Sequence, residues 1–561
     1  MARRRIGAAM SACFLACSLA STWRAVLLTL VSLSLSCAAV FVALALCDYA
    51  SHAERLSRIV DVDVFLGTKA TATDKVVIYA TQVAFGAFKA RMSPAPVPLS
   101  LVPGPEGTGW WNMVVSRRAS ESQNVTPLKA QVIVGTLRMG YGHARIAHAV
   151  ASHFSRAAAQ EQRLPGKVVV LDMLDMDCAE SRLVAAADGV YRKVSKVASE
   201  ANGLIEKAWG RVTMSGDARL ARSQWRTAEV LVSALEAWPD KATPFVATHP
   251  LLGCVAVHAG FTRVINCCID NNAHEFVVVP GAALNLCQGP AQCLALRALR
   301  FNGPRLRAVG HWVPREVLDS AEDDNRRRLR RAGENPNSGV RVLVPFGGAG
   351  AQTRYIVHLL GLLGPSVRAG KVEVCVNCGD HVEAFRDVAE AVQRHHPLMQ
   401  VVAFVKDRDG LDALCGAWRD DGKRDQSDVV GRIHVCSFLE GGAEARFLAV
   451  HATDVLIRFA DVLMSKPSEL SFMPLPKIML RRVGDHEMRN AERAAELGDG
   501  TPECRSPEDA ARWLEVLLAE RSRCDLDGWW PAMCERIIMN LRTGVYAGAS
   551  MVRDNVRIMN K

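Results

Sequence analysis

The stretch Gln131–Phe154 (QVIVGTLRMGYGHARIAHAVASHF) constrains the fold more than any other part of the chain. It begins with an apolar β-branched run, Val132–Val134, crosses a glycine-containing loop, and resumes after His143 with apolar residues at helical spacing. A strand, a glycine loop and a helix in this order point backbone N–H groups and a helix N-terminus at a ligand, often an anionic one. The stretch therefore predicts a Rossmann-like unit with His143 at the mouth of its ligand loop.

Short apolar runs alternate with helical patterns from this stretch to about residue 310. Such alternation predicts a parallel, doubly wound sheet, whose ligands bind at the carboxyl ends of the strands. The strands expected in this half of the chain are Val132–Val134, Lys167–Leu171, Phe245–Thr248, Arg263–Ile269, Phe276–Val279 and Arg307–Val309.

A second half with the same organisation begins at Val340–Pro345, which leads into a second glycine loop. Either glycine loop alone could be a tight turn without a ligand, but two in matching positions favour two domains that face a ligand cleft. Further strands are expected at Val372–Val376, Val401–Phe404, Ile433–Val435 and Lys477–Leu480, and Val455–Ile457 and Val462–Met464 are weaker candidates.

The chain has 561 residues, which is too many for a single hydrophobic core. We predict a Rossmann-like domain at 126–318, a second at 319–515, and C-terminal helices at 516–561. A poorly defined segment at 61–125 precedes them, and its Ser93–Gly109 part is rich in Pro and Gly, as in a linker.

The N-terminal segment at 1–60 contains an uncharged apolar run, Ala25–Cys47, that is long enough to cross a bilayer. We expect a signal anchor, and the alternatives are a cleaved signal peptide or a start at Met92 or Met113. The arginines before the run place the main body outside the cytosol, whereas reduced cysteines and nucleotide chemistry favour the inside. We predict a membrane-associated protein whose body lies on the cytoplasmic face.

The net charge of +10 comes partly from arginine clusters, including five arginines within residues 326–331. Such clusters suit an anionic membrane surface or nucleic acid, and they also occur on solvated helix faces. Nucleic-acid binding is disfavoured because only 6 tyrosines are present and aromatic and basic residues are not interleaved.

The 17 cysteines are scattered through apolar runs, which is typical of buried, reduced thiols rather than of a disulfide framework. Cys375 and Cys378 form one C-x-x-C with no second pair at zinc spacing, so no metal site is predicted.

Four motifs along the chain resemble those of one enzyme family. They are Gly140-Tyr141-Gly142-His143 before an alanine-rich helix, Asp270 after a strand with His274 shortly afterwards, the turn Gly310–Pro314, and the loop with Gly347, Gly348 and Gly350. Together they resemble the two-domain, GT-B-fold glycosyltransferases that act on membrane lipids. The resemblance is stronger to the monogalactosyldiacylglycerol synthases and processive diacylglycerol glucosyltransferases, and weaker to the N-acetylglucosaminyltransferase that forms lipid II.

The run Asp461–Glu469 also resembles this family, in which a Ser/Thr-Lys-Pro loop leads to a glutamate that binds the nucleotide ribose. Glu469 fits that position, but the family's glycine pair is missing here and the loop is several residues shorter. The later motif Glu487-Met488-Arg489-Asn490 matches the family's Glu-x-x-Asn before a helix.

The resemblance implies a GT-B-like α/β fold and the inverting transfer of a sugar from a UDP-sugar to a membrane lipid such as diacylglycerol. No cofactor or metal is required. The implied roles are: His143 or Asp270 as the base; Gly347, Gly348, Gly350 and Ser465 around the diphosphate; Glu469 on the ribose; Glu487 and Asn490 on the sugar; and Gly140, Tyr141 and Gly142 in the acceptor-side loop.

Other interpretations remain open. A GT-B-shaped protein could bind a ligand or a partner without transfer, and a UDP-sugar epimerase would share the general fold. The residues also have plainer interpretations: His143 as a satisfied loop histidine, Asp270 as a strand-end cap, and Glu469 and Glu487 on a solvated helix face.

Overall fold

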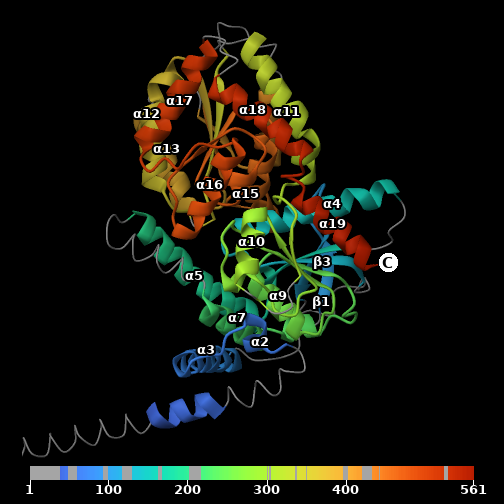
Figure 1. Cartoon of the computed structure of the whole chain (residues 1–561). Coiled ribbons are helices and arrows are strands. Elements are labelled where there is room, and N and C mark those ends of the chain that lie inside the picture. Colours follow the sequence, from blue (N-terminus) through green and yellow to red (C-terminus); the bar gives the residue numbers. More distant parts are fainter. Residues whose placement is uncertain are drawn as a thin grey trace, which may run out of the picture.

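The chain folds into two α/β domains, one above the other in Figure 1, each built around its own sheet. The computed structural model describes residues 38–47, 60–91, 99–115, 129–161, 167–200, 217–299, 301, 305–334, 338–348, 350–395, 402–419, 432–440, 442–522 and 528–560.

The N-terminal domain contains an eight-stranded sheet in the order β1-β2-β4-β3-β5-β6-β7-β8. All neighbouring strands are parallel except β1 and β2, which form an antiparallel hairpin at one edge. The strands are β1 (Leu99–Pro103), β2 (Trp111–Val115), β3 (Ala130–Thr136), β4 (Lys167–Asp172), β5 (Phe245–Ala247), β6 (Val264–Cys267), β7 (Leu284–Cys287) and β8 (Leu306–Ala308).

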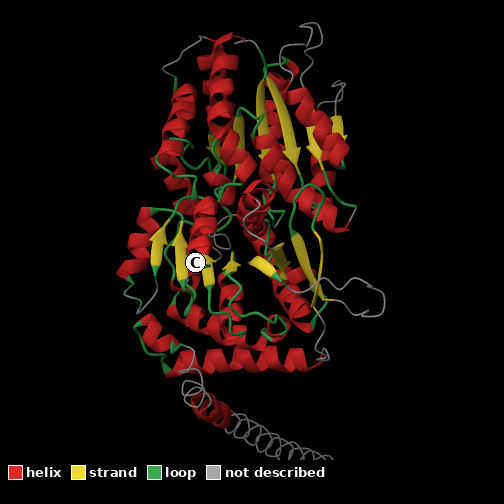
Figure 2. Cartoon of the chain, turned by 90° about the vertical axis from the view of Figure 1, so that its right-hand side faces the viewer, coloured by secondary structure: helices red, strands yellow, loops and turns green. Residues whose placement is uncertain are grey.

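Helices cover both faces of this sheet (Figure 1 and Figure 2), as the connections between parallel strands require. They are α2 (Val62–Leu66), α3 (Ala72–Arg91), α4 (Gly142–Glu161), α5 (Ala179–Glu200), α7 (Ala218–Val230), α8 (Ser233–Glu236), α9 (Pro250–His258) and α10 (Pro290–Ala298), with short 3₁₀ turns η1 (Met173–Asp175) and η2 (Glu275–Val277).

The C-terminal domain contains a six-stranded, all-parallel sheet in the order β11-β12-β10-β9-β13-β14. Its strands are β9 (Val340–Pro345), β10 (Val372–Asn377), β11 (Val402–Val405), β12 (Ile433–Cys436), β13 (Val462–Ser465) and β14 (Lys477–Met479). Its helices are α11 (Arg315–Glu334), α12 (Thr353–Arg368), α13 (Val382–His395), α14 (Arg408–Arg419), α15 (Gly442–Ile457), α16 (Met488–Leu497), α17 (Pro507–Ser522) and α18 (Trp529–Arg542), with η4 (Glu469–Phe472) and η5 (Asp485–Glu487).

The last helix, α19 (Gly548–Met559), belongs spatially to the first domain, where it packs against α4 (Figure 1). Val552 and Val556 of α19 share one buried cluster with Ile146 and Val150 of α4. The chain therefore crosses between the domains twice, once on the way out and once on the way back.

The prediction of two parallel-sheet, Rossmann-like domains is confirmed. Every residue of β9 and β10 is buried, because helices cover both faces of the sheet. Strands of this kind are continuous apolar runs in sequence, which is why the pattern could be recognised.

Three local expectations are wrong. The segment expected to be a linker, Ser93–Gly109, contributes edge strand β1. The expected strand Phe276–Val279 begins in the turn η2, and its Val277 carbonyl accepts a hydrogen bond from Asn266 Nδ2 at 2.7 Å, while β7 occupies the place beside β6. Val455–Ile457 forms the end of helix α15. A three-residue apolar run does not distinguish a strand from a helix end.

Most of the apolar run Ala25–Cys47 lies outside the described residues. Its described part, residues 38–47, is helical. Within the part of the chain that is described, no helix combines the length and the apolar character needed to cross a bilayer.

The arginine run at 326–331, expected to face an anionic surface or solvent, is partly internal. Arg328 is buried, and its guanidinium donates to the carbonyls of Ile457 and Ala460 at 2.6 and 2.7 Å. It thereby satisfies acceptors left unpaired at the C-terminal end of α15. Arg331 forms an ion pair with Asp461. These two arginines hold α11 to the sheet rather than facing a partner.

We predict that Arg328→Ala destabilises the C-terminal domain by about 2–4 kcal/mol, because it leaves buried carbonyls without donors. The matched control is Arg326→Ala, which removes only an exposed i,i+4 pair with Glu322 and should cost less than about 0.5 kcal/mol. Differential scanning calorimetry of both variants measures the difference, and equal melting temperatures would contradict this role of Arg328.

Candidate functional site

The two sheets bring their topological switch points toward each other. In the first sheet the strand order reverses between β3 and β5, and in the second between β9 and β13. Ligands of doubly wound sheets bind in the crevice outside the carboxyl ends of the strands at such a point. Both glycine loops, and the loop that carries Glu469, leave from these strand ends.

His143 lies at the first switch point, in the first turn of α4. The ring is buried, and its Nδ1 lies 2.6 Å from the carbonyl oxygen of Thr248, which follows β5. A carbonyl only accepts, so Nδ1 carries the proton and Nε2 holds a lone pair. Burial lowers the pKa of His143, while that hydrogen bond and the charges of Asp270 and Glu469 act against the shift. The ring is therefore neutral and in the tautomer that can accept a proton at Nε2.

Asp270 and Asn490 meet across the domain boundary. Asn490, fully buried in α16 of the second domain, donates from Nδ2 to Asp270 Oδ1 at 3.0 Å and to the Pro467 carbonyl at 3.1 Å. Its Oδ1 accepts the Asn271 backbone N–H at 2.8 Å. The Asn490 side chain thus bonds across the domain boundary to Asp270 and Asn271, and within its own domain to Pro467.

Tyr141, in the first glycine loop, contacts the C-terminal domain through its side chain and its backbone. Its hydroxyl forms a hydrogen bond with the Asp380 carboxylate and accepts the Asp380 backbone N–H at 2.9 Å. A side chain at Gly348 would overlap the backbone of Gly140 and Tyr141. The loops therefore touch backbone to backbone, and glycine at position 348 is what permits it.

A buried ion pair lies next to this contact. Arg145 of α4 pairs with Asp454 of α15, and its Nε lies 3.8 Å from Glu469 Oε1. Burial raises the pKa of Asp454 to about 6, with Arg145 acting in the opposite direction. A Cβ on Gly142 would lie 2.9 Å from the Glu469 carboxylate, so Glu469 packs against the N-terminal turn of α4.

Lys466 and Glu487 form a second cluster beside the Gly347 loop. They are joined by an ion pair, and Glu487 also accepts the Val483 backbone N–H at 2.8 Å. Burial alone would raise the pKa of Glu487, but the charges of Lys466 and His486 hold it below its ordinary value. A Cβ on Gly347 would lie 2.5 Å from Lys466 Cε, so the lysine stem lies against this loop.

The structure thus brings His143, Asp270, Glu469 and Asn490 to one place between the domains, and Gly347 and Glu487 to a second. Glu487 is buried rather than on a solvated helix face, and the Ser465 hydroxyl is buried against the Lys466 carbonyl at 3.1 Å.

Sequence reasoning missed Arg145, Lys466, Asp380 and Asp454. Arg145 follows His143 by two positions on an alanine-rich helix, where an internal charge needs a partner, so a signal existed for that residue. The sequence contains no comparable signal for the partners Asp380 and Asp454.

Nothing in the described residues resembles a metal centre, since no group of three or more His, Cys, Asp or Glu side chains is placed to hold an ion. In the C-x-x-C pair both thiols are buried, and Cys375 Sγ lies 3.6 Å from Cys436 Sγ in the core.

Two family models match the chain. Residues 109–297 match one described as Domain of unknown function (DUF6937), and residues 302–556 match Domain of unknown function (DUF6938). Together they cover most of both Rossmann-like domains and of the returning helix α19, and the second model begins before β8, the last strand of the first sheet. No curated protein matches the sequence.

Solved structures with a similar fold include a UDP-GlcNAc 2-epimerase from Neisseria meningitidis bound to UDP-GlcNAc. It is 10% identical, with a TM-score of 0.40, over 76% of this chain and 98% of that one. An α,α-trehalose 6-phosphate synthase from Burkholderia multivorans is 13% identical, with a TM-score of 0.37, over 77% and 99%. A UDP-forming synthase of the same kind from Burkholderia vietnamiensis is 13% identical, with a TM-score of 0.36, over 77% and 100%.

We predict that Gly348→Ala opens the contact between the glycine loops, because the added methyl group overlaps backbone that cannot move independently. Small-angle X-ray scattering should show a larger radius of gyration. The control is Gly361→Ala within α12, where a Cβ meets nothing within 4 Å and the exchange should stabilise the helix by about 0.5–1 kcal/mol. An unchanged radius for Gly348→Ala would show that the loops do not hold the domains together.

We also predict that the protein loses stability as the pH falls from about 6.5 to 4. Burial lowers the pKa of His148 to about 3 and of His451 to about 4, so these rings stay neutral in the folded state and take up protons on unfolding. Asp172 and Asp454, with pKa values raised to about 6, act in the opposite sense over the same range.

Further histidines with a lowered pKa add to the first effect, and they are His143, His153, His249, His258, His274 and His311. Melting temperatures measured by calorimetry should therefore fall between pH 7 and pH 5. A constant or rising melting temperature over that interval would show that the two carboxyl groups outweigh the histidines.

Proposed function

We propose that this chain is a UDP-sugar-dependent glycosyltransferase with a GT-B arrangement, which transfers the sugar to a hydroxyl group of a membrane lipid such as diacylglycerol. The donor binds the C-terminal domain, and the acceptor binds the N-terminal domain. The observation that carries the proposal is the meeting of the two switch points, where Asn490 and Glu469 of one domain reach Asp270 and Gly142 of the other.

His143 is the proposed base. Transfer to a hydroxyl requires a group that accepts its proton as the new bond forms. The neutral ring, with Nδ1 fixed on the Thr248 carbonyl, presents Nε2 as that acceptor. Asp270, close enough to influence the pKa of His143, stabilises the imidazolium once the proton has moved. A carboxylate near the ring favours its charged form.

The departing UDP needs positive charge and N–H donors around its diphosphate. The loop with Gly347, Gly348 and Gly350 leads into helix α12, whose N-terminus adds its dipole. Lys466 supplies a cation against Gly347, held there by Glu487. In this proposal Glu469 accepts hydrogen bonds from the ribose hydroxyls, and no metal is required.

Donor entry requires the two glycine loops to separate, because Gly348 lies directly against Gly140 and Tyr141. The arrangement described is therefore the closed one, and it places Tyr141 over the loop that would hold the diphosphate. Binding energy from UDP must exceed that of the Tyr141–Asp380 contact and of the Arg145–Asp454 ion pair.

The lipid acceptor, the inverting course and the position at the cytoplasmic face of a membrane rest on the sequence resemblance and on the apolar run Ala25–Cys47. One structural observation supports the cytoplasmic side. The thirteen cysteines in the described residues are all free, as expected in a reducing compartment.

The closed loop contact also favours a second candidate, a GT-B-shaped protein that binds a ligand or partner without transfer. Such a protein would keep the contact between Gly348 and Tyr141 permanently. The two candidates differ in nucleotide binding, since only the enzyme needs a site for UDP.

Two measurements test the proposal. UDP added at about 100 times its dissociation constant should stabilise the fold by about 2.7 kcal/mol, visible as a thermal shift. Radiolabelled UDP-glucose or UDP-galactose should label diacylglycerol in mixed vesicles. His143→Ala should lower the rate at least about 100-fold, because general-base catalysis contributes that much.

His358→Ala is the control, since this exposed histidine on α12 pairs only weakly, at 3.3 Å, with Glu508. A thermal shift that is lost in Lys466→Ala would place the diphosphate at the second glycine loop. A melting temperature that no nucleoside diphosphate changes would contradict the enzyme proposal and favour the binding protein.

A further inference from the structure

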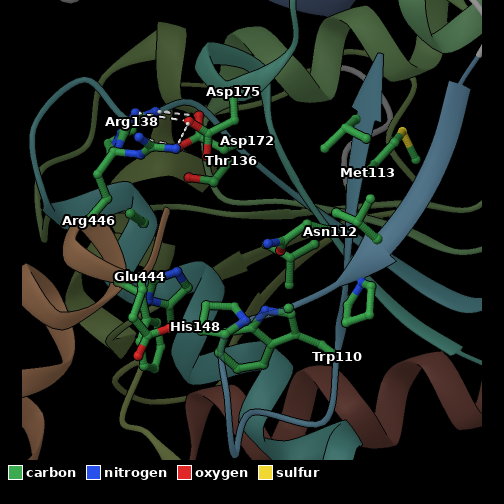
Figure 3. A pocket seen from close by; sticks show the side chains of 18 of the residues that line it. Trp110, Asn112, Met113, Thr136, Arg138, His148, Asp172, Asp175, Glu444 and Arg446 are labelled. Atoms are coloured by element: carbon green, nitrogen blue, oxygen red, sulfur yellow. Dashed lines mark hydrogen bonds and ion pairs between the residues drawn. The ribbon is translucent and has the colours of Figure 1, made fainter. Parts of the chain in front are cut away.

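A cavity of about 420 Å³ lies beside the loop that carries His143 but does not include that residue (Figure 3). Its walls come from the β1–β2 hairpin, the ends of β3 and β4, helix α4 and the first turn of α15. None of the proposed transfer residues His143, Asp270, Lys466 and Glu469 lines it. Its volume lies within the usual range for small-molecule sites.

One wall of the cavity is aromatic. The Trp110 ring stacks on His148 at 5.4 Å between centroids and meets Phe447 of the second domain edge-on at 5.9 Å. The hairpin holds Trp110 in place, because its carbonyl accepts the Gly104 N–H at 2.9 Å. Burial lowers the pKa of His148 to about 3, so this wall is uncharged at neutral pH.

The opposite wall is polar and internally paired. Arg138 contacts both Asp172 and Asp175 at 3.3 Å, and Arg446 of the second domain contacts Asp175 at 3.1 Å. These guanidinium and carboxylate groups are planar and hold one another in place. They therefore offer rigid donors and acceptors to a ligand. The half-buried amide of Asn112 lies between the two walls (Figure 3).

Two uncharged lining residues have a buried polar atom without a hydrogen-bond partner among the described residues. The Thr136 side chain is 1% exposed and its hydroxyl bonds to nothing there, and His148 Nδ1 also has no partner there. An unsatisfied buried hydroxyl costs free energy, which a polar ligand that reaches it from the cavity would recover.

The charges decide which ligand fits. The lining contains two arginines, Arg138 and Arg446, against four carboxylates, Asp172, Asp175, Glu106 and Glu444. Arg408, outside the lining, pairs with Glu444, which leaves an excess of one carboxylate. A phosphate or carboxylate would add negative charge to this excess and would be repelled. A neutral ring with several hydroxyl groups would instead use both kinds of wall, since its C–H face packs on aromatic rings and its hydroxyls donate and accept.

We propose that this cavity between the β1–β2 hairpin, α4 and α15 binds a neutral polyhydroxylated ring, a pyranose or a cyclitol. The ring packs on the wall formed by Trp110, His148 and Phe447, and its hydroxyls bond to Thr136, Asn112 and the Asp172 carboxylate. The ligand contacts both domains, because Phe447 and Arg446 come from the second. The site goes beyond the proposed transfer reaction and does not depend on it.

Saturation-transfer NMR on the full chain provides the test, with glucose, galactose, N-acetylglucosamine and myo-inositol as probes. A second arm presents the same rings as lipid headgroups, in vesicles containing a glycosyldiacylglycerol or phosphatidylinositol. Transfer to free rings identifies a soluble ligand, and transfer to the headgroups alone identifies a lipid. Glucose 6-phosphate and uridine are included as rings that the charges or the hydroxyl pattern should exclude.

Thr136→Val removes only the unpartnered hydroxyl, so it should leave the melting temperature unchanged or higher while weakening ring binding at least about tenfold. Thr227→Val, at a buried threonine of α7 outside the cavity, is the matched control and should leave binding unchanged. Trp110→Phe tests the aromatic wall.

The inference is overturned if no neutral ring binds at millimolar concentration, if glucose 6-phosphate or uridine binds more tightly than the neutral rings, or if Thr136→Val binds as well as the wild type. No nucleotide is added in this experiment, so ring binding can be observed even if the transferase proposal fails. Conversely, a UDP thermal shift without ring binding would support the transferase proposal and contradict the ring site.

Discussion

The two segments that cross between the domains bind each other, and the relative placement of the domains depends on that contact. The His311 N–H donates to the Val545 carbonyl at 2.7 Å, and the Gly548 N–H donates to the His311 carbonyl at 2.9 Å. A Cβ at Gly310 would lie 2.6 Å from the Gly544 carbonyl oxygen, and Gly310 has a φ of +101°. Only glycine fits at position 310, so the two crossing segments contact each other through their backbones.

A buried polar cluster fixes one side of this contact. Tyr546, between α18 and α19, donates to Asp499, which pairs with Lys477 of β14 at 2.9 Å, and all three side chains are fully buried. Removing any member would leave an uncompensated buried group, which is costly. The second crossing is thus attached to the C-terminal domain up to Tyr546 and to the N-terminal domain from Gly548 onward.

The sequence was sufficient to predict both sheets and both glycine loops, because strands buried on two faces are continuous apolar runs. It was insufficient for the contacts between domains. Arg145 and Asp454 are 309 residues apart, and no local pattern records such a pair. Composition misled at the first edge strand, where a Pro-rich segment suggested a linker. Pro103 is tolerated there because β1 pairs on only one side, so a missing N–H can face away from the sheet.

The return of α19 to the first domain has a consequence for the order in which the protein can fold during synthesis. Helix α4 leaves the ribosome first, and Val552 and Val556, which cover its apolar face, are made roughly 400 residues later. At roughly 5–20 residues per second, translation of the intervening chain takes tens of seconds. Throughout that time the first domain carries an uncovered hydrophobic strip, which chaperones or the ribosome surface must shield. The second domain, whose elements are continuous in sequence, can close before the first is complete.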